Sequence, residues 1–138
     1  MLDTDIVSYA IKGEFPSVEA HMRRLDVMQV CISAVTRGEL RFGVRRLRDA
    51  TRDTTRGANR LAAEVEGFLS TIHTLPWDEI AADEFAEVRA ELERGGTPIG
   101  VMDTMIAAHA KSIGATLVTN NVKHFHKVKG LTVENWVG

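Results

Sequence analysis

The sequence contains a single cysteine and no apolar run that approaches the ~20 residues of a membrane-spanning helix. Acids interrupt the N-terminus almost at once, which argues against a signal peptide, and no internal repeat, low-complexity tract or linker is present. The single Cys31 lies in an apolar run, where a small buried hydrophobe is expected rather than a reactive thiol. These absences exclude a membrane span and predict a protein of the reducing cytoplasm.

Charge is segregated along the chain although the net charge is only −2. Residues 37–60 carry eight arginines against three acids, whereas residues 61–103 carry ten acids against two arginines. Such a basic region is typical of a surface that binds a polyanion, and it is equally compatible with solvated helix faces. The length of 138 residues and the apolar fraction of 44% predict one globular domain, residues 1–138, with a complete core.

Short apolar runs rich in β-branched residues alternate with segments of helical periodicity. Strands are predicted at residues 1–4, 30–33, 72–75 and 115–119, with a further short one near 131–133. Helices are predicted at 6–12, at 17–24 with Ser17 as its cap, after Ser33 as a cap, at 58–69, from the cap Asp78 to Gly95, and at 101–113 with Gly114 ending it. The alternation predicts an α/β fold with a small parallel sheet of four or five strands and helices on both faces.

Acidic side chains follow the predicted strands or open the predicted helices. Asp3 and Asp5 end the first strand, Glu39 lies in the helix after the second strand, and Asp103 opens an alanine-rich helix. Taken alone, Asp103 is also explained as an acid that stabilises a helix N-terminus. In a parallel sheet, functional groups gather at the carboxyl ends of the strands, so these acids are expected to converge. Convergent carboxylates favour Mg²⁺ or Mn²⁺ over zinc, and such an ion favours cleavage of a phosphodiester.

Four groups of residues, taken together, span nearly the whole chain in a specific order. They are Leu2-Asp3-Thr4-Asp5-Ile6; Ile32-Ser33 with Thr36-Arg37-Gly38-Glu39-Leu40 and Gly43; Pro98-Ile99-Gly100 with Asp103 and Ile106-Ala107-Ala108-His109-Ala110; and Val118-Thr119-Asn120-Asn121 with Phe125 and Val133-Glu134-Asn135-Trp136. This combination resembles the PIN-domain ribonucleases, in particular the VapC toxins of type II toxin-antitoxin pairs. No single group would be specific, but the combination is.

The resemblance implies a metal-dependent endoribonuclease in which Asp3, Glu39 and Asp103 are the catalytic acids and bind Mg²⁺ or Mn²⁺. Asp5 stands where the family often has Asn, and it is expected to add charge or to orient its neighbours. Only two residues precede Asp3, fewer than is usual in the family, as expected if the chain is shortened or begins at a later Met. A first strand this short offers Asp3 few backbone hydrogen bonds.

Two further residues of the resemblance lie after the late strand. Thr119 is expected beside the acids as a hydrogen-bonding residue, and Asn121 stands where many PIN domains have a fourth Asp. A neutral Asn121 leaves open whether one or two ions bind. The segment Thr119-Asn120-Asn121 after this strand resembles that of the VapC branch that cuts initiator tRNA at its anticodon loop and so inhibits translation. The resemblance also implies a homodimer that is neutralised by a VapB-type antitoxin.

The basic residues are the strongest signal outside the acids. Arginine contacts to phosphates position RNA and make its binding dependent on salt. The expected RNA-binding residues are Arg41, Arg45, Arg48, Arg52 and Lys123. In VapC toxins the same region can also receive the antitoxin.

Three other interpretations use the same sequence. A phosphoacceptor receiver domain is also a parallel α/β fold, but it needs a lysine at a late strand end, where this chain has Thr119. A weakened, non-catalytic module that binds RNA or protein would be expected to lose its acids. His124 and His126 lack a third soft ligand at a spacing suited to zinc.

Overall fold

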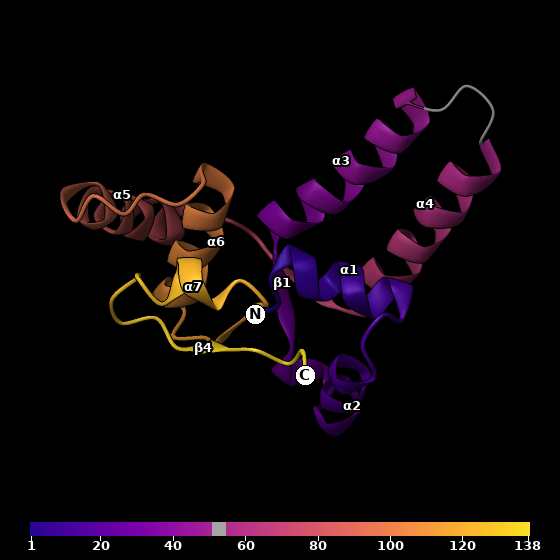
Figure 1. The fold of residues 1–138 in the computed structure, drawn as a ribbon, viewed down its shortest axis with the longest axis horizontal. Coiled ribbons are helices and arrows are strands. Elements are labelled where there is room, and N and C mark those ends of the chain that lie inside the picture. The colour runs from indigo at the N-terminus through magenta and orange to yellow at the C-terminus, as the bar shows by residue number, and fades with distance from the viewer. Residues whose placement is uncertain (51–54) are drawn as a thin grey trace.

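The computed structural model describes residues 1–50 and 55–138, and these form an α/β fold (Figure 1). The helices are α1 (Thr4–Lys12), α2 (Pro16–Arg24), the 3₁₀ turn η1 (Val27–Gln29), α3 (Ala34–Ala50), α4 (Thr55–Leu69), α5 (Glu79–Arg94), α6 (Val101–Ser112) and α7 (Val122–Phe125). The strands are β1 (Cys31–Ser33), β2 (His73–Leu75), β3 (Leu117–Val118) and β4 (Val133–Glu134). Two elements, η1 and α7, were not predicted.

The strands form two parallel pairs that the N-terminal residues join. Strand β1 pairs with β2, and β3 pairs with β4. Leu2 lies between the pairs, because its N–H donates to the carbonyl of Cys31 at 2.9 Å and it forms a parallel bridge with Val118. The resulting order is β2, β1, Leu2, β3, β4, which confirms the predicted parallel α/β arrangement.

Helices cover both sides of these strands and bury a core on each (Figure 1). On one side, α1 to α4 contribute fully or nearly fully buried residues such as Ile6, Val18 and Val65. On the other side, α5, α6 and α7 bury Ile106 and Phe125. The N-terminus therefore lies in the middle of the molecule, where the carboxyl ends of the strands are surrounded by helices from both layers.

The ends of several helices follow from local sequence. The hydroxyl of Ser33 accepts the Val35 N–H at 3.1 Å, and the Asp78 carboxylate accepts the Ala81 N–H at 3.0 Å, so both predicted caps are confirmed. The prediction that Ser17 caps α2 is wrong. The helix begins at Pro16, whose fixed φ suits the first helical position without a side-chain cap.

Helices α3 and α4 pack against each other and project from the body of the molecule (Figure 1). Arg52, one of the predicted RNA-binding residues, lies in the connection between them, outside the described residues. Among the helices that the structure describes, none is long and apolar enough to cross a membrane.

Candidate active site

Asp3 lies where the short N-terminal strand turns into α1, and the fold holds it at three points. Its backbone N–H donates to the Val118 carbonyl at 2.8 Å. Its Oδ1 accepts the backbone N–H of Thr4, and its Oδ2 accepts the hydroxyl of Thr119, each at 2.8 Å. Thr119 is fully buried and Asp3 is 5% exposed. Asp3 is thus fixed more firmly than the short strand predicts, since the helix start and the β3 end both bind its carboxylate.

Asp5 connects α1 to the segment after β3. Its Oδ1 accepts the N–H of Ile6 at 2.6 Å, and its Oδ2 accepts the backbone N–H of Asn120 at 3.1 Å. The side chain is only partly buried. Asp5 therefore orders the loop that carries Asn121 and keeps a second carboxylate close to Asp3.

The electrostatic surroundings of these two acids are unusual. Burial, reinforced by the charges of Asp5 and Asp103, raises the pKa of Asp3 to about 7, although its hydrogen bonds from Thr119 and Thr4 oppose the rise. Burial also raises the pKa of Asp5, with Asp103 adding to the effect and the Asn120 and Ile6 N–H groups opposing it. The three aspartates therefore act on one another, and the protein's own donors do not balance their negative charge.

Glu39 reaches the same place from α3 through Thr4. The Thr4 hydroxyl donates to Glu39 Oε1 at 2.7 Å and lies 3.2 Å from the hydroxyl oxygen of buried Thr36. Since the Thr4 backbone also binds Asp3, this one residue orients both acids. Sequence reasoning missed Thr4, although its position between Asp3 and Asp5 was a signal.

Asp103 stands in the first turn of α6 and faces α7. Its Oδ2 lies 3.7 Å from Nδ1 of His124. The side-chain nitrogen of Asn121 lies 2.8 Å from the same Nδ1, and the Asn121 N–H donates to the Thr119 hydroxyl at 2.9 Å. Thr119 and Asn121 thus link the side chain of Asp3 to the neighbourhood of Asp103.

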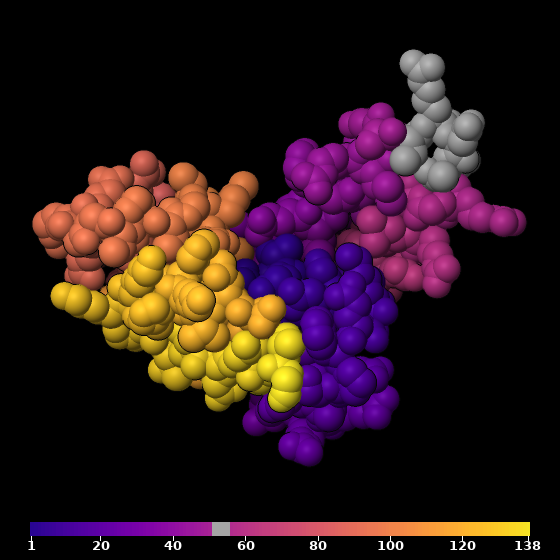
Figure 2. Space-filling model, in the orientation of Figure 1, coloured from indigo at the N-terminus to yellow at the C-terminus, as the bar shows by residue number. Residues whose placement is uncertain are grey.

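A groove between α3 and α6 contains Glu39. Thr4, Glu39, Phe42, Arg46 and Met102 are among the residues that line it. Figure 2 shows the corresponding notch, with the indigo N-terminal segment at its base between α6 and α3. Of the four acids, Glu39 lines this groove directly, and Thr4, which binds both Asp3 and Glu39, lines it beside Glu39.

The predicted basic residues lie in different places. Arg41, Arg45 and Arg48 share the side of α3 that borders α4, where Arg41 pairs with Glu66 at 3.0 Å and Arg48 donates to Asn59 at 3.3 Å. Lys123 is exposed on α7. Arg46, which sequence reasoning did not single out, shares the groove with Glu39, because residues seven apart occupy one helix face.

The donor set fits a divalent cation. Asp3, Asp5, Glu39 and Asp103 offer carboxylate oxygens, the ligands that Mg²⁺ and Mn²⁺ prefer. A cation would also supply the positive charge that the raised pKa values of Asp3 and Asp5 call for. Within the described residues, however, no three Asp, Glu, His or Cys side chains are already placed as one ligand group.

Comparison with known proteins agrees with this fold. Residues 1–131 match the family model of the PIN domain. The chain is 40% identical over 136 residues to a tRNA(fMet)-specific endonuclease VapC of Shigella flexneri, covering 99% of this chain and 96% of that protein. Two solved complexes are also similar, each with a TM-score of 0.85. One is DNA-bound VapBC from Salmonella typhimurium, with 37% identity and coverage of 99% of this chain and 96% of that one.

The other complex is VapBC2 from Rickettsia felis bound to a DNA fragment from their promoter. It is 32% identical and covers 99% of this chain and 97% of that one. These three matches extend over almost the full length of both chains, and they include both the sequence and the fold. The chain therefore belongs to the PIN-domain family and, within it, to the VapC-type ribonuclease toxins.

Proposed function

We propose that this VapC-type ribonuclease depends on Mg²⁺ or Mn²⁺, with the ion held by Asp3, Glu39 and Asp103. The observation that carries the proposal is the cluster of acids: Asp3 is affected by the charges of Asp5 and Asp103, and Thr4 binds both Asp3 and Glu39, which lines the groove. When bound, such an ion activates water and neutralises phosphate charge during cleavage at phosphorus. Retention of the acids argues against a weakened binding module, and family membership decides against a receiver domain.

The chain's own residues prepare the site in three ways. Thr4 and Thr119 fix the carboxylate of Asp3, and the Thr4 hydroxyl directs Glu39 toward the same place. Asp5 holds the loop after β3. Because these hydrogen bonds already hold the carboxylates in place, little side-chain entropy has to be lost when the substrate binds, which is the usual basis of preorganised catalysis.

We propose initiator tRNA as the substrate, cut in the anticodon loop, with inhibition of translation in the cytoplasm as the result. The support is the similarity to a relative named as a tRNA(fMet)-specific endonuclease at 40% identity, and to a second one from Salmonella typhimurium at 37%. The similarity to VapBC complexes supports a VapB-type antitoxin as the partner that neutralises the activity.

Cleavage of two purified tRNAs tests this function. We expect the protein to cut initiator tRNA at one position and to spare elongator methionine tRNA, which reads the same codon. EDTA should abolish cleavage, and added Mg²⁺ or Mn²⁺ should restore it. Cleavage that persists in EDTA would contradict the proposed metal dependence, and equal cleavage of both tRNAs would contradict the proposed specificity.

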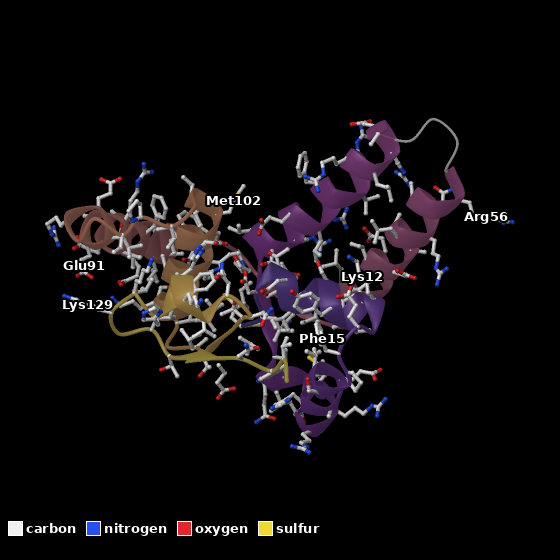
Figure 3. All side chains as sticks on the ribbon, in the orientation of Figure 1. Lys12, Phe15, Arg56, Glu91, Met102 and Lys129 are labelled. Carbon is white, nitrogen blue, oxygen red and sulfur yellow. The ribbon has the colours of Figure 1, made fainter. Side chains whose placement is uncertain are left out.

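We also propose that the chain forms a homodimer through the outer rim of the groove, which leaves Glu39 and Arg46 inside it open to RNA. Phe42 on α3 and Met102 on α6 are 62% and 52% exposed, and Val101 beside Met102 is 55% exposed. Figure 3 shows Met102 at the end of α6 nearest the notch. Apolar side chains gathered in this way are typical of a surface that another chain covers.

Changing Met102 to Glu should convert the dimer to a monomer, because a carboxylate would be buried without a partner. Sedimentation velocity at micromolar concentration measures the result. Ile113→Glu is the matched control, since Ile113 is 48% exposed at the opposite end of α6. A wild type that sediments as a monomer, or a Met102→Glu variant that remains dimeric, would show that this rim is not the interface.

A further inference from the structure

His124 on α7 stands beside the acids without a part in the function proposed so far. Its Nδ1 lies 3.7 Å from Oδ2 of Asp103, and the two side chains are 47% and 32% exposed. Both groups can therefore be reached by an ion from solvent. No other histidine makes an ion-pair contact with a site acid among the described residues.

The Nδ1 atom of His124 faces Asn121 as well as Asp103. The side-chain nitrogen of Asn121 lies 2.8 Å from Nδ1, an arrangement that suits the tautomer in which Nδ1 is the acceptor. A neutral imidazole nitrogen is a common metal ligand. Rotation of the Asn121 side-chain amide by about 180° would exchange its oxygen and nitrogen. The amide oxygen, which can also bind a metal ion, would then lie beside Nδ1.

The separation of the two atoms is compatible with one ion. Ligand atoms lie about 2.1 Å from an ion of this size, so two ligands of the same ion are at most about 4.2 Å apart. The 3.7 Å between His124 Nδ1 and Asp103 Oδ2 falls below that limit. A cation that bridges them would also relieve the repulsion that Asp103 exerts on Asp3 and Asp5.

We propose that His124 is a nitrogen ligand of the divalent ion bound by Asp103, and that it makes this centre prefer Mn²⁺ over Mg²⁺. The inference rests on the proposed metal dependence and adds a ligand to it. An imidazole strengthens binding of transition-metal ions, whereas Mg²⁺ is bound almost entirely through oxygen. The imidazole would stand next to the neutral Asn121, where a fourth acid was expected from the family resemblance.

Pulsed electron paramagnetic resonance of Mn²⁺ bound to the full-length protein tests the ligand directly, without an activity assay. We expect a nitrogen coupling of directly bound imidazole in the wild type. In protein whose histidines alone are labelled with ¹⁵N, the ¹⁴N coupling should be replaced by a ¹⁵N coupling, which assigns it to a histidine. The coupling should be lost in His124→Gln. His126→Gln is the matched control on the same segment, because its Nδ1 lies 3.1 Å from the Val122 carbonyl.

Metal titrations give the second measurement. We expect His124→Gln to weaken Mn²⁺ binding by about tenfold or more and to leave Mg²⁺ affinity unchanged. Even the loss of a residue that only hydrogen-bonds a metal ligand costs about tenfold in affinity, so the loss of a direct ligand should cost at least as much. Bound Mn²⁺ without imidazole coupling, or equal weakening of both ions, would overturn the role of His124 and leave the acid site intact. Failure of the wild type to bind either Mn²⁺ or Mg²⁺ would overturn the proposed metal dependence as well.

Discussion

Replacing Asp3 with asparagine is expected to slow RNA cleavage about a thousandfold and, in metal-free protein above pH 7, to stabilise the fold. The loss of activity follows because metal-borne charge stabilisation is worth several kcal/mol and each 1.4 kcal/mol is about a factor of ten. The gain in stability follows from the position of Asp3, which is 5% exposed and beside two other acids.

The sign of the pH effect follows from the raised pKa. Asp3 titrates near 3.8 when the chain is unfolded and at about 7 when it is folded. Between these values the folded state binds a proton that the unfolded state does not, so the free energy of unfolding falls as pH rises through this window. The total loss is of order a few kcal/mol, because one pKa unit corresponds to ~1.4 kcal/mol. Asparagine cannot ionise and escapes this loss.

Urea unfolding in EDTA at pH 5 and pH 8 measures the effect. We expect Asp3→Asn to exceed the wild type by a larger margin at pH 8 than at pH 5, because pH 5 lies only a little above the pKa of 3.8 in the unfolded chain. We expect added Mn²⁺ to stabilise only the wild type. Asp83→Asn, at an exposed position of α5, controls for the removal of one charge. If Asp3→Asn is the less stable protein at pH 8, Asp3 serves mainly as the cap of α1.

Replacing Arg45 and Arg48 together with glutamine is expected to raise KM for RNA and to flatten the salt dependence of binding. The slope of log K against log salt is negative, and each lost phosphate contact should make it smaller in magnitude by about one. The slope of the double variant should therefore be smaller in magnitude by about two. Metal affinity should not change, because both side chains lie on the side of α3 that borders α4 rather than the groove. Fluorescence anisotropy of labelled tRNA at several salt concentrations measures the slope.

Two single variants separate the faces of α3. Arg46→Gln should make the slope smaller in magnitude by about one, because Arg46 lines the groove with Glu39. Arg41→Gln should have the smaller effect, because Glu66 already neutralises Arg41 at 3.0 Å. An unchanged slope in the double variant would show that Arg45 and Arg48 face the antitoxin or solvent and that RNA enters beside Lys123.

Local sequence patterns predicted the fold well, because each signal acts over a few residues. Alternating strands and helices, the Asp78 cap and the glycine after α6 depend on neighbours in the chain, and the structure confirms all three. The order of the strands in the sheet could not be predicted from such local patterns. It depends on Leu2 joining Cys31 to Val118, and no pattern within a short segment encodes contacts between residues so far apart.

The candidate site was predictable only in part for the same reason. Asp3 and Asp103 stood out as acids at element boundaries, whereas the role of Thr4 depends on Glu39, 35 residues later. His124 gave no signal of this kind, because its approach to Asp103 requires α7, a four-residue helix too short to show a periodic pattern. Long-range contacts of this kind appear only once the chain has folded.

The most direct test of a metal-dependent tRNA ribonuclease built on Asp3 is to sequence the RNA ends that form during brief expression in cells. Wild-type protein is compared with Asp3→Ala at equal protein level. We predict new ends concentrated at one position in the anticodon loop of initiator tRNA with the wild type, and none above background with Asp3→Ala. The same ends at the same frequency with both proteins would contradict the assignment of Asp3 to the catalytic centre.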